Sequence, residues 1–301
     1  MQLNELRQEL RFNTELVQLI ETLKNIAASQ YHSMEKEKER FEAFMEAFSG
    51  YFRVVDLAGV DDPLMANRVP TIGIVMVTSD SGFMGGLNRG VVDSGLDAQG
   101  ALSHEETRLI VIGEKGAGML HDRERDYQFF HGISQDTIYE QAVEIRDYIV
   151  GEVLAGRMGR VMVSYPKPLS FTAQTIDVIN ILPCGVLFDR DAESPISRHT
   201  KSQRLTEESS RVIVESAATD IVEYLAAVWV TSKLMEVFED SKLAEFSARA
   251  MHLEGSFQRL RDEQAKLKLK TFKAVHEKVD RGMRDSFSAL ATRRRQPGRS
   301  S

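Results

Sequence analysis

The placement of proline constrains this fold more than any other feature. The chain has 301 residues and seven prolines, yet residues 1–62 and 196–296 contain none. Proline removes a helical N–H and clashes with the preceding turn, so long stretches without it can form long helices. We therefore expect two long terminal helices around a central domain. The expected boundaries are helices at 1–60 and 205–292, an α/β domain at 69–185, a linker at 186–204 and a basic tail at 293–301.

Apolar residues in both terminal segments recur at spacings of three and four, which is typical of a helix with one buried stripe. The N-terminal stripe is Leu16, Leu19, Leu23 and Ile26. The C-terminal stripe runs from Phe246 to Leu267 and continues at a spacing of four through Thr271, Val275, Val279, Met283 and Phe287. An isolated stripe needs a partner surface. Either the two ends pair as an antiparallel coiled coil, or each helix pairs with a copy of itself.

The central segment has a different pattern, in which short apolar runs alternate with helical intervals. Strands are expected at 71–77, 107–112, 127–130, 160–165 and 171–182, with Pro166 ending the fourth. Helices are expected at 89–98, 115–123 and 135–155. This alternation predicts βαβ units and a mostly parallel sheet. The fold class is therefore α/β, with a five-stranded Rossmann-like domain flanked by long helices that form an antiparallel coiled coil.

Composition and charge argue against several functions. The formal net charge of −7 argues against a general nucleic-acid-binding protein, which is usually basic. The single cysteine, Cys184, excludes an internal disulfide. No run of about 18 apolar residues occurs, so we expect a soluble chain that associates with a membrane only through partners. No two histidines have metal-ligand spacing, so we expect neither a metal nor a cofactor.

The turn after the first expected strand is the strongest candidate for chemistry. It reads Thr78-Ser-Asp-Ser-Gly-Phe-Met-Gly-Gly-Leu-Asn88. A glycine-rich turn at this place can hold phosphate on backbone N–H groups. This turn has neither the glycine spacing of a dinucleotide site nor the lysine of a P-loop. We expect a structural turn, and two alternative functions stay open: a nucleotide-binding α/β enzyme and a self-associating coiled-coil scaffold.

The same turn resembles the T-[ST]-D-R-G-L-C-G-G-L-N segment of gamma subunits of F-type ATP synthases. Ser81, Phe83 and Met84 stand where that family has Arg, Leu and Cys. Three further segments resemble the family and come in its order: Ile26-Ala-Ala-Ser29, Ile112-Gly-Glu-Lys-Gly116 and Ala248-Arg-Ala-Met251. The resemblance covers nearly the whole chain, which is identified as a divergent member of the family.

The resemblance implies a central rotor stalk that contains no catalytic site. In this family the helix pair lies inside a ring of alpha and beta subunits, and the α/β domain is a foot near the epsilon subunit and the membrane ring of c subunits. The complex couples proton or sodium flow to ATP synthesis or hydrolysis at the cytoplasmic face of the cell membrane. No nucleic acid and no cofactor is implied for the chain itself.

The resemblance also assigns residues to two contact regions. Contacts to the catalytic ring are expected from Leu23, Lys24, Ile26, Val275, Val279, Arg281 and Met283. The foot motif comprises Thr78, Asp80, Gly82, Gly85, Gly86, Leu87 and Asn88. Residues 15–23 and 276–283 depart from the family pattern. Either the partner surfaces have changed with them, as in a second rotary complex, or the coupling is altered.

Overall fold

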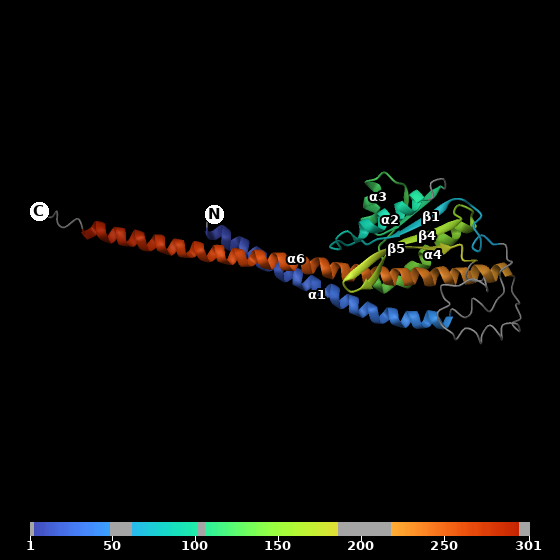
Figure 1. The fold of residues 1–301 in the computed structure, drawn as a ribbon, viewed down its shortest axis with the longest axis horizontal. Helices are drawn as coiled ribbons and strands as arrows, with labels where there is room; N and C mark the ends of the chain where they lie inside the picture. The colour runs from blue at the N-terminus through green and yellow to red at the C-terminus, as the bar shows by residue number, and fades with distance from the viewer. Residues whose placement is uncertain (1–2, 49–61, 102–105, 186–217, 295–301) are drawn as a thin grey trace. The chain divides into compact units, whose positions relative to one another are not determined.

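The computed structural model describes residues 3–48, 62–101, 106–185 and 218–294 (Figure 1). The chain divides into two compact units, Met1–Ile26 with His252–Ser301 and Ala27–Met251. The helices α1 (Leu3–Phe48) and α6 (Ala218–Arg294) contribute residues to both units. The expected linker at 186–204, the helical residues expected at 49–60 and 205–217, and tail residues 295–301 lie outside the described residues.

The larger unit is built around a five-stranded sheet in the order β3-β2-β1-β4-β5. The strands are β1 (Ile72–Val77), β2 (Thr107–Ile112), β3 (Tyr127–Phe130), β4 (Arg160–Ser170) and β5 (Ala173–Leu182). The first four strands are parallel to one another, and β5 is antiparallel to β4. The mostly parallel α/β sheet expected from the sequence is confirmed. Every residue of the central strand β1 is buried, which explains its unbroken apolar sequence.

Helices cover both faces of this sheet. They include α2 (Leu87–Ala101), α3 (Glu114–His121), the 3-10 turn η2 (Gln135–Thr137) and α4 (Ile138–Leu154). In β1, Ile74 and Met76 pack in a cluster with α2 and α3 residues, whereas Val75 and Val77 pack in a cluster with α4 and α6 residues. Successive strand residues point to opposite faces, so one strand contributes to two cores. Figure 1 shows α2 and α3 on one side of the sheet, with α4 and α6 on the other.

Strand β4 is longer than the sequence predicted and continues through Pro166 and Pro168. Its pairing with β1 ends at Ser164, so β5 is the strand that pairs with both prolines. Proline lacks an N–H and is tolerated in a strand with a free edge. The prediction that Pro166 ends the strand was wrong because proline prevents pairing on one side of a strand only. Beyond Ser164, β4 and β5 form a two-stranded segment, which we call the β4–β5 arm (165–177).

The smaller unit is an antiparallel pair formed by the first part of α1 and the last part of α6. Gln264 Nε2 donates a hydrogen bond to Thr14 Oγ1 at 3.0 Å. Nearer the other end, Lys24 Nζ lies 2.9 Å from Glu254 Oε2. Because the residue numbers rise along one helix as they fall along the other, the two segments run in opposite directions. Their apolar seam consists of Val17, Ile20, Leu253 and Phe257, with Leu16, Leu23 and Leu260 packed against it.

The buried stripe of α1 differs from the predicted one. Leu19 and Ile26 are 54% and 49% exposed, so the prediction that they belong to the seam was wrong. The buried positions instead include a series spaced seven residues apart: Leu6, Asn13, Ile20, Ala27 and Met34. Asn13 and Ala27 carry no strong apolar signal, and a choice based on hydrophobicity therefore favoured the neighbouring face. On α6, the predicted stripe from Phe246 to Leu267 is confirmed by its burial.

A buried carboxylate links the end of α4 to the start of β2. Glu152 is 8% exposed, and its Oε2 accepts hydrogen bonds from Arg157 Nε at 2.9 Å and from Arg108 Nη1 at 3.2 Å. The hydrogen bonding from Arg157 lowers the pKa of Glu152, and the positive charges of Arg157 and Arg108 add to this effect against the opposing effect of burial. The charged form of Glu152 is therefore the form that stabilises the folded unit.

We predict that Glu152→Gln lowers the free energy of unfolding by about 1–3 kcal/mol at neutral pH, because two arginines lose a charged acceptor. The folded-state pKa lies below the ordinary value of 4.5. The stabilisation is therefore fully present above that value and is lost as pH falls through the folded-state pKa. Urea unfolding at neutral pH and at several acidic pH values measures this. The exposed Glu144→Gln is the control, and a Glu152→Gln deficit that stays constant with pH would contradict the assignment.

Candidate functional site

The turn at 78–88 fastens the ends of three strands together. Thr78 Oγ1 donates a hydrogen bond to the carbonyl of Ile112 at 2.6 Å and accepts one from the N–H of Gly116 at 3.0 Å. Gly113, just after β2, has a φ of 98°, and a Cβ there would lie 2.6 Å from the carbonyl oxygen of Thr78. A side chain at Gly113 would be strained and would also clash. The Thr78 side chain therefore joins the end of β1 to the end of β2.

Asp80 extends this connection to β3. Its Oδ1 accepts hydrogen bonds from the N–H of Glu114 at 2.8 Å and of Gly132 at 3.1 Å. A Cβ at Gly132 would lie 2.6 Å from the Asp80 carboxyl group, so a side chain there would displace that carboxyl group from the N–H of Gly132. A carboxylate at the N-terminus of α3 is also favoured by the partial positive charge of the helix end. Asp80 thus holds the turn against α3 and the segment that follows β3.

The remaining foot-motif residues shape the start of α2. Asn88 Oδ1 accepts a hydrogen bond from the N–H of Ser79 at 3.1 Å, and its Nδ2 donates to Ser79 Oγ at 3.0 Å. Gly85 has a φ of 59°, which suits glycine, whereas a Cβ at Gly82 or Gly86 would meet no atom within 4 Å. Leu87 is the first residue of α2. The motif therefore acts through its backbone and its polar side chains, and it keeps β1 and α2 in a fixed relation.

These hydrogen bonds use the donors that a phosphate would need. In doubly wound folds, ligands bind beyond the carboxyl ends of the strands, often at a helix N-terminus with free N–H groups. At the N-terminus of α3, the N–H groups of Glu114 and Gly116 donate to Asp80 and Thr78, and that of Lys115 donates to the carbonyl of Ser79 at 3.0 Å. The site geometry therefore favours the structural turn expected from the sequence over a nucleotide site.

The described residues also show little that could hold a metal or act as a nucleophile. Within 3–48, 62–101, 106–185 and 218–294, no group of three or more His, Cys, Asp or Glu side chains is arranged to hold a metal ion. Burial raises the pKa of the Cys184 thiol to about 12. That thiol therefore stays protonated at neutral pH, and its Sγ donates to the carbonyl of Leu64 at 3.3 Å.

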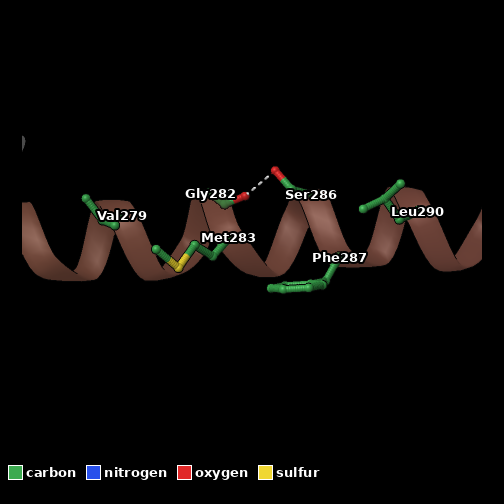
Figure 2. Close-up of a pocket in the computed structure, with 6 residues that line it drawn as sticks. All are labelled: Val279, Gly282, Met283, Ser286, Phe287 and Leu290. Carbon is green, nitrogen blue, oxygen red and sulfur yellow. Dashed lines mark hydrogen bonds between the residues drawn. The ribbon is translucent and has the colours of Figure 1, made fainter.

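The second candidate site is an exposed apolar face near the end of α6. Val279, Met283, Phe287 and Leu290 are between 47% and 71% exposed. Figure 2 shows that these side chains and the intervening Gly282 and Ser286 all come from this one helix, and Ser286 Oγ donates to the carbonyl of Gly282 at 2.8 Å. We call residues 279–290 the apolar end of α6. Clusters of exposed apolar side chains mark interaction surfaces more often than isolated ones do.

The register of the helix pair explains why this end is exposed. Thr14 contacts Gln264 and Lys24 contacts Glu254, and the residue numbers in each pair add up to 278. Leu3, the first described residue of α1, therefore lies opposite residue 275. Val275 is half-buried, whereas every residue from 276 to 290 is exposed. No described residue of α1 lies opposite the apolar end of α6.

The structure separates the expected ring contacts into two groups. Leu23 packs against the seam, and Lys24 pairs with Glu254 and lies 4.7 Å from the centre of the Phe257 ring. Hydrogen bonds from Gln258 and then from Lys24 lower the pKa of Glu254. The second group lies on the surface: Ile26, Val279, Arg281 and Met283.

Sequence reasoning overlooked some exposed apolar residues near these positions. Phe12 is 68% exposed and precedes Leu19 and Ile26 at intervals of seven, so the three form a second face of α1. On α6, Leu269 and Phe272 are 56% and 62% exposed. The seven-residue spacing of the α1 face was visible in the sequence, but deciding between two adjacent apolar faces required the register of the pair.

The chain is similar to known proteins over most of its length. A family model described as ATP synthase matches residues 2–281. The ATP synthase gamma chain of Desulforudis audaxviator is 25% identical over 200 residues. The matched region covers 65% of this chain and 66% of that relative, which is just under two thirds of its length. The gamma chain of Synechococcus elongatus is 22% identical over 77% of this chain and 79% of its own length. A chain in a Euglena gracilis mitochondrial ATP synthase structure has a similar fold, with a TM-score of 0.64, 13% identity, and coverage of 99% of this chain and 98% of its own.

We predict that Asp80→Ala lowers the free energy of unfolding by about 1–2 kcal/mol, because backbone N–H groups of α3 and Gly132 lose a charged acceptor. Thermal and urea unfolding measure this, with the exposed Asp97→Ala on α2 as the control. Equilibrium titration with ATP should show no micromolar binding to either variant or to the unchanged chain. Micromolar ATP binding that Asp80→Ala abolishes would favour the nucleotide-binding alternative instead.

Proposed function

The chain belongs to the ATP synthase family as a gamma subunit, and on this premise we propose that it is the central rotor stalk of a rotary ATP synthase. It is a non-catalytic subunit. In this proposal the helix pair turns inside a ring of alpha and beta subunits that carries the catalytic sites. The observation that carries the proposal is an antiparallel helix pair whose longer member ends in an exposed apolar face.

The apolar end of α6 is the surface that we assign to the inside of the ring. Fully burying a side chain such as Met or Phe contributes about 1.5–3 kcal/mol. Gly282 has no side chain and that of Ser286 is small, so a partner can approach the helix backbone closely on this side. Arg281 is exposed beside it and supplies a polar contact in the proposal. The surface thus combines a large apolar contribution with a charged group that favours one orientation.

A stalk transfers energy only if the states of the ring bind its faces with different affinities. The faces of this helix pair differ in chemistry. Phe12, Leu19 and Ile26 form an apolar face on α1, whereas Lys266, Lys270 and Lys273 are exposed along α6. No acidic residue occurs between residues 264 and 276. When the pair turns, each catalytic site meets an apolar and then a basic surface, which is the asymmetry that this mechanism requires.

The α/β domain is the foot in this proposal, with the epsilon subunit and the membrane ring of c subunits as its partners. The foot motif at 78–88 supports the role by holding the ends of the first three strands together. No helix among the described residues is both long enough and apolar enough to cross a bilayer. On the ground of family membership, we propose attachment through the c ring at the cytoplasmic face of the membrane, with protons or sodium ions as the coupled species.

Reconstitution with alpha and beta subunits from the same source tests this function. We predict that the chain binds the ring and changes its rate of ATP hydrolysis. Phe287→Asp should weaken binding at least about tenfold, because a carboxylate would replace an apolar side chain in the interface. Ser288→Asp introduces the same charge on the side of the helix opposite the apolar stripe and is the control.

Two outcomes would count against the proposal. One is a chain that neither binds the ring nor changes its hydrolysis rate. The other is a stable homodimer of the pure chain in sedimentation that Phe287→Asp dissociates, because this result would favour the self-associating scaffold. If Phe287→Asp and Ser288→Asp weaken ring binding equally, the assignment of the apolar end of α6 to the ring is wrong.

A further inference from the structure

The β4–β5 arm needs support from outside the sheet. Beyond Ser164, β4 no longer pairs with β1, so the arm consists of two strands. An isolated two-stranded hairpin is at best marginally stable in water. Pro166 and Pro168 stiffen the arm, because the proline ring fixes φ, but they add no hydrogen-bond donors. Contacts with other elements must therefore hold the arm in place.

Strand β5, whose first half forms one side of the arm, lies lengthwise along α6 within the larger unit. At one end of β5, Trp229 Nε1 of α6 donates a hydrogen bond to the carbonyl of Ile181 at 3.3 Å. At the other end, Gln174 Nε2 donates to Ser247 Oγ at 2.9 Å. From residue 174 to 181 a strand advances about 23 Å, and from 229 to 247 a helix advances about 27 Å. Because the two lengths agree, strand and helix run alongside each other between these contacts.

The base of the arm also packs against α6, because Tyr165 belongs to the buried cluster that includes α6 residues. Tyr165 of β4 is 2% exposed and lies opposite Asp177 of β5. Burial is the main cause that raises the pKa of Tyr165, and the charges of Asp240 and Glu236 on α6 contribute to this effect. Lys167 Nζ donates a hydrogen bond to Asp177 Oδ2 at 3.2 Å. Tyr165 thus packs in the cluster that includes α6 residues, and Lys167 pairs with Asp177 within the arm.

The tip of the arm reaches the other long helix. The ring centre of Phe171 lies 5.0 Å from that of Tyr31 on α1, in an edge-to-face arrangement. It lies 6.1 Å from that of His32, in a stacked arrangement. Tyr31 is 6% exposed and belongs to the same apolar cluster as Met34 and the α6 residues. One hairpin thus contacts both helices, through Gln174 on one side and Phe171 on the other.

We propose that the β4–β5 arm is a brace that fixes the rotational position of both helices against the sheet of the larger unit, with Phe171 and Gln174 as positioning residues. The functional consequence rests on the proposed rotor function. A stalk that turns in a ring must pass a twisting force between its helices and its α/β domain. The arm contacts both helices at points away from the sheet. These contacts resist rotation of the helices against the α/β domain.

Hydrogen exchange on the full chain tests whether these contacts hold the arm. We expect Phe171→Ala and Gln174→Ala to speed exchange of the amides at 173–178 by roughly tenfold, which is the scale of one aromatic pair or one hydrogen bond. Exchange in β1 should stay unchanged, because its contacts are not altered. Leu169→Ala is the control, since Leu169 lies close to the tip and is 67% exposed. Unchanged exchange in both variants would overturn the brace.

A second measurement tests the role in coupling. In the reconstituted membrane complex, we expect Phe171→Ala to lower the number of ions pumped per ATP hydrolysed at least twofold, whereas ATP hydrolysis by the ring continues. Phe171→Tyr, which keeps the ring contact, should restore the ratio, and Leu169→Ala should not change it. A merely structural role would alter exchange but leave this ratio intact, and that result would overturn the proposal. If no complex forms with the unchanged chain, the rotor function fails while the exchange result still decides whether the arm is held as described.

Discussion

Burial of one face of α6 against α1 is the interaction on which the smaller unit depends. The seam is short and includes polar residues: Asn13 is 5% exposed, and Gln264 bonds to Thr14. A buried polar residue in a helix seam costs stability but can select one register, because other registers leave it without a partner. Gln264 and Thr14 can form their hydrogen bond only in the observed register, so this pair favours that register over others. The register in turn determines how much of α6 extends past α1.

The α/β domain shows how a nucleotide-binding topology can be used for a mechanical role. Its strand order and its glycine-rich turn are those in which a phosphate site is expected. The difference lies in Thr78 and Asp80, whose side chains occupy the N–H groups that a phosphate would use. Function depends on such sites and cannot be read from the fold class alone. Here the same turn that binds ligands in related topologies joins three strands and a helix.

Much of the fold could be predicted from the sequence because its signals are local. The strands at 107–112 and 127–130 were predicted with the bounds that the structure shows, because apolar runs end at turn residues. The extension of β4 past Pro166 could not be predicted, since it depends on where β1 stops pairing. The seam of α1 was assigned to the wrong face at Leu19 and Ile26, since two apolar faces lie side by side on this helix. Such features depend on contacts between segments that are distant in the sequence.

The candidate site was predictable to a different degree in each region. The foot motif was identified from its residues, but the roles of Asp80 and Asn88 required the positions of α3 and α2. For the ring contacts, the sequence identified the apolar spacing at Val279 and Met283 but not their exposure, which follows from the register of the pair. Lys24 was expected to contact the ring, and the contacts that the structure shows for it, with Glu254 and Phe257, lie within the pair.

The apolar end of α6 also suggests how this stalk tolerates a divergent sequence. Identity to the gamma chains named above is 22–25%. An apolar contact surface depends on buried area more than on the identity of each side chain, because the hydrophobic effect is non-directional. A four-residue spacing of Val279, Met283 and Phe287 keeps such a surface on one side of a helix whatever the intervening residues are. The foot motif cannot vary in this way, since Asp80 and Thr78 act through directional hydrogen bonds.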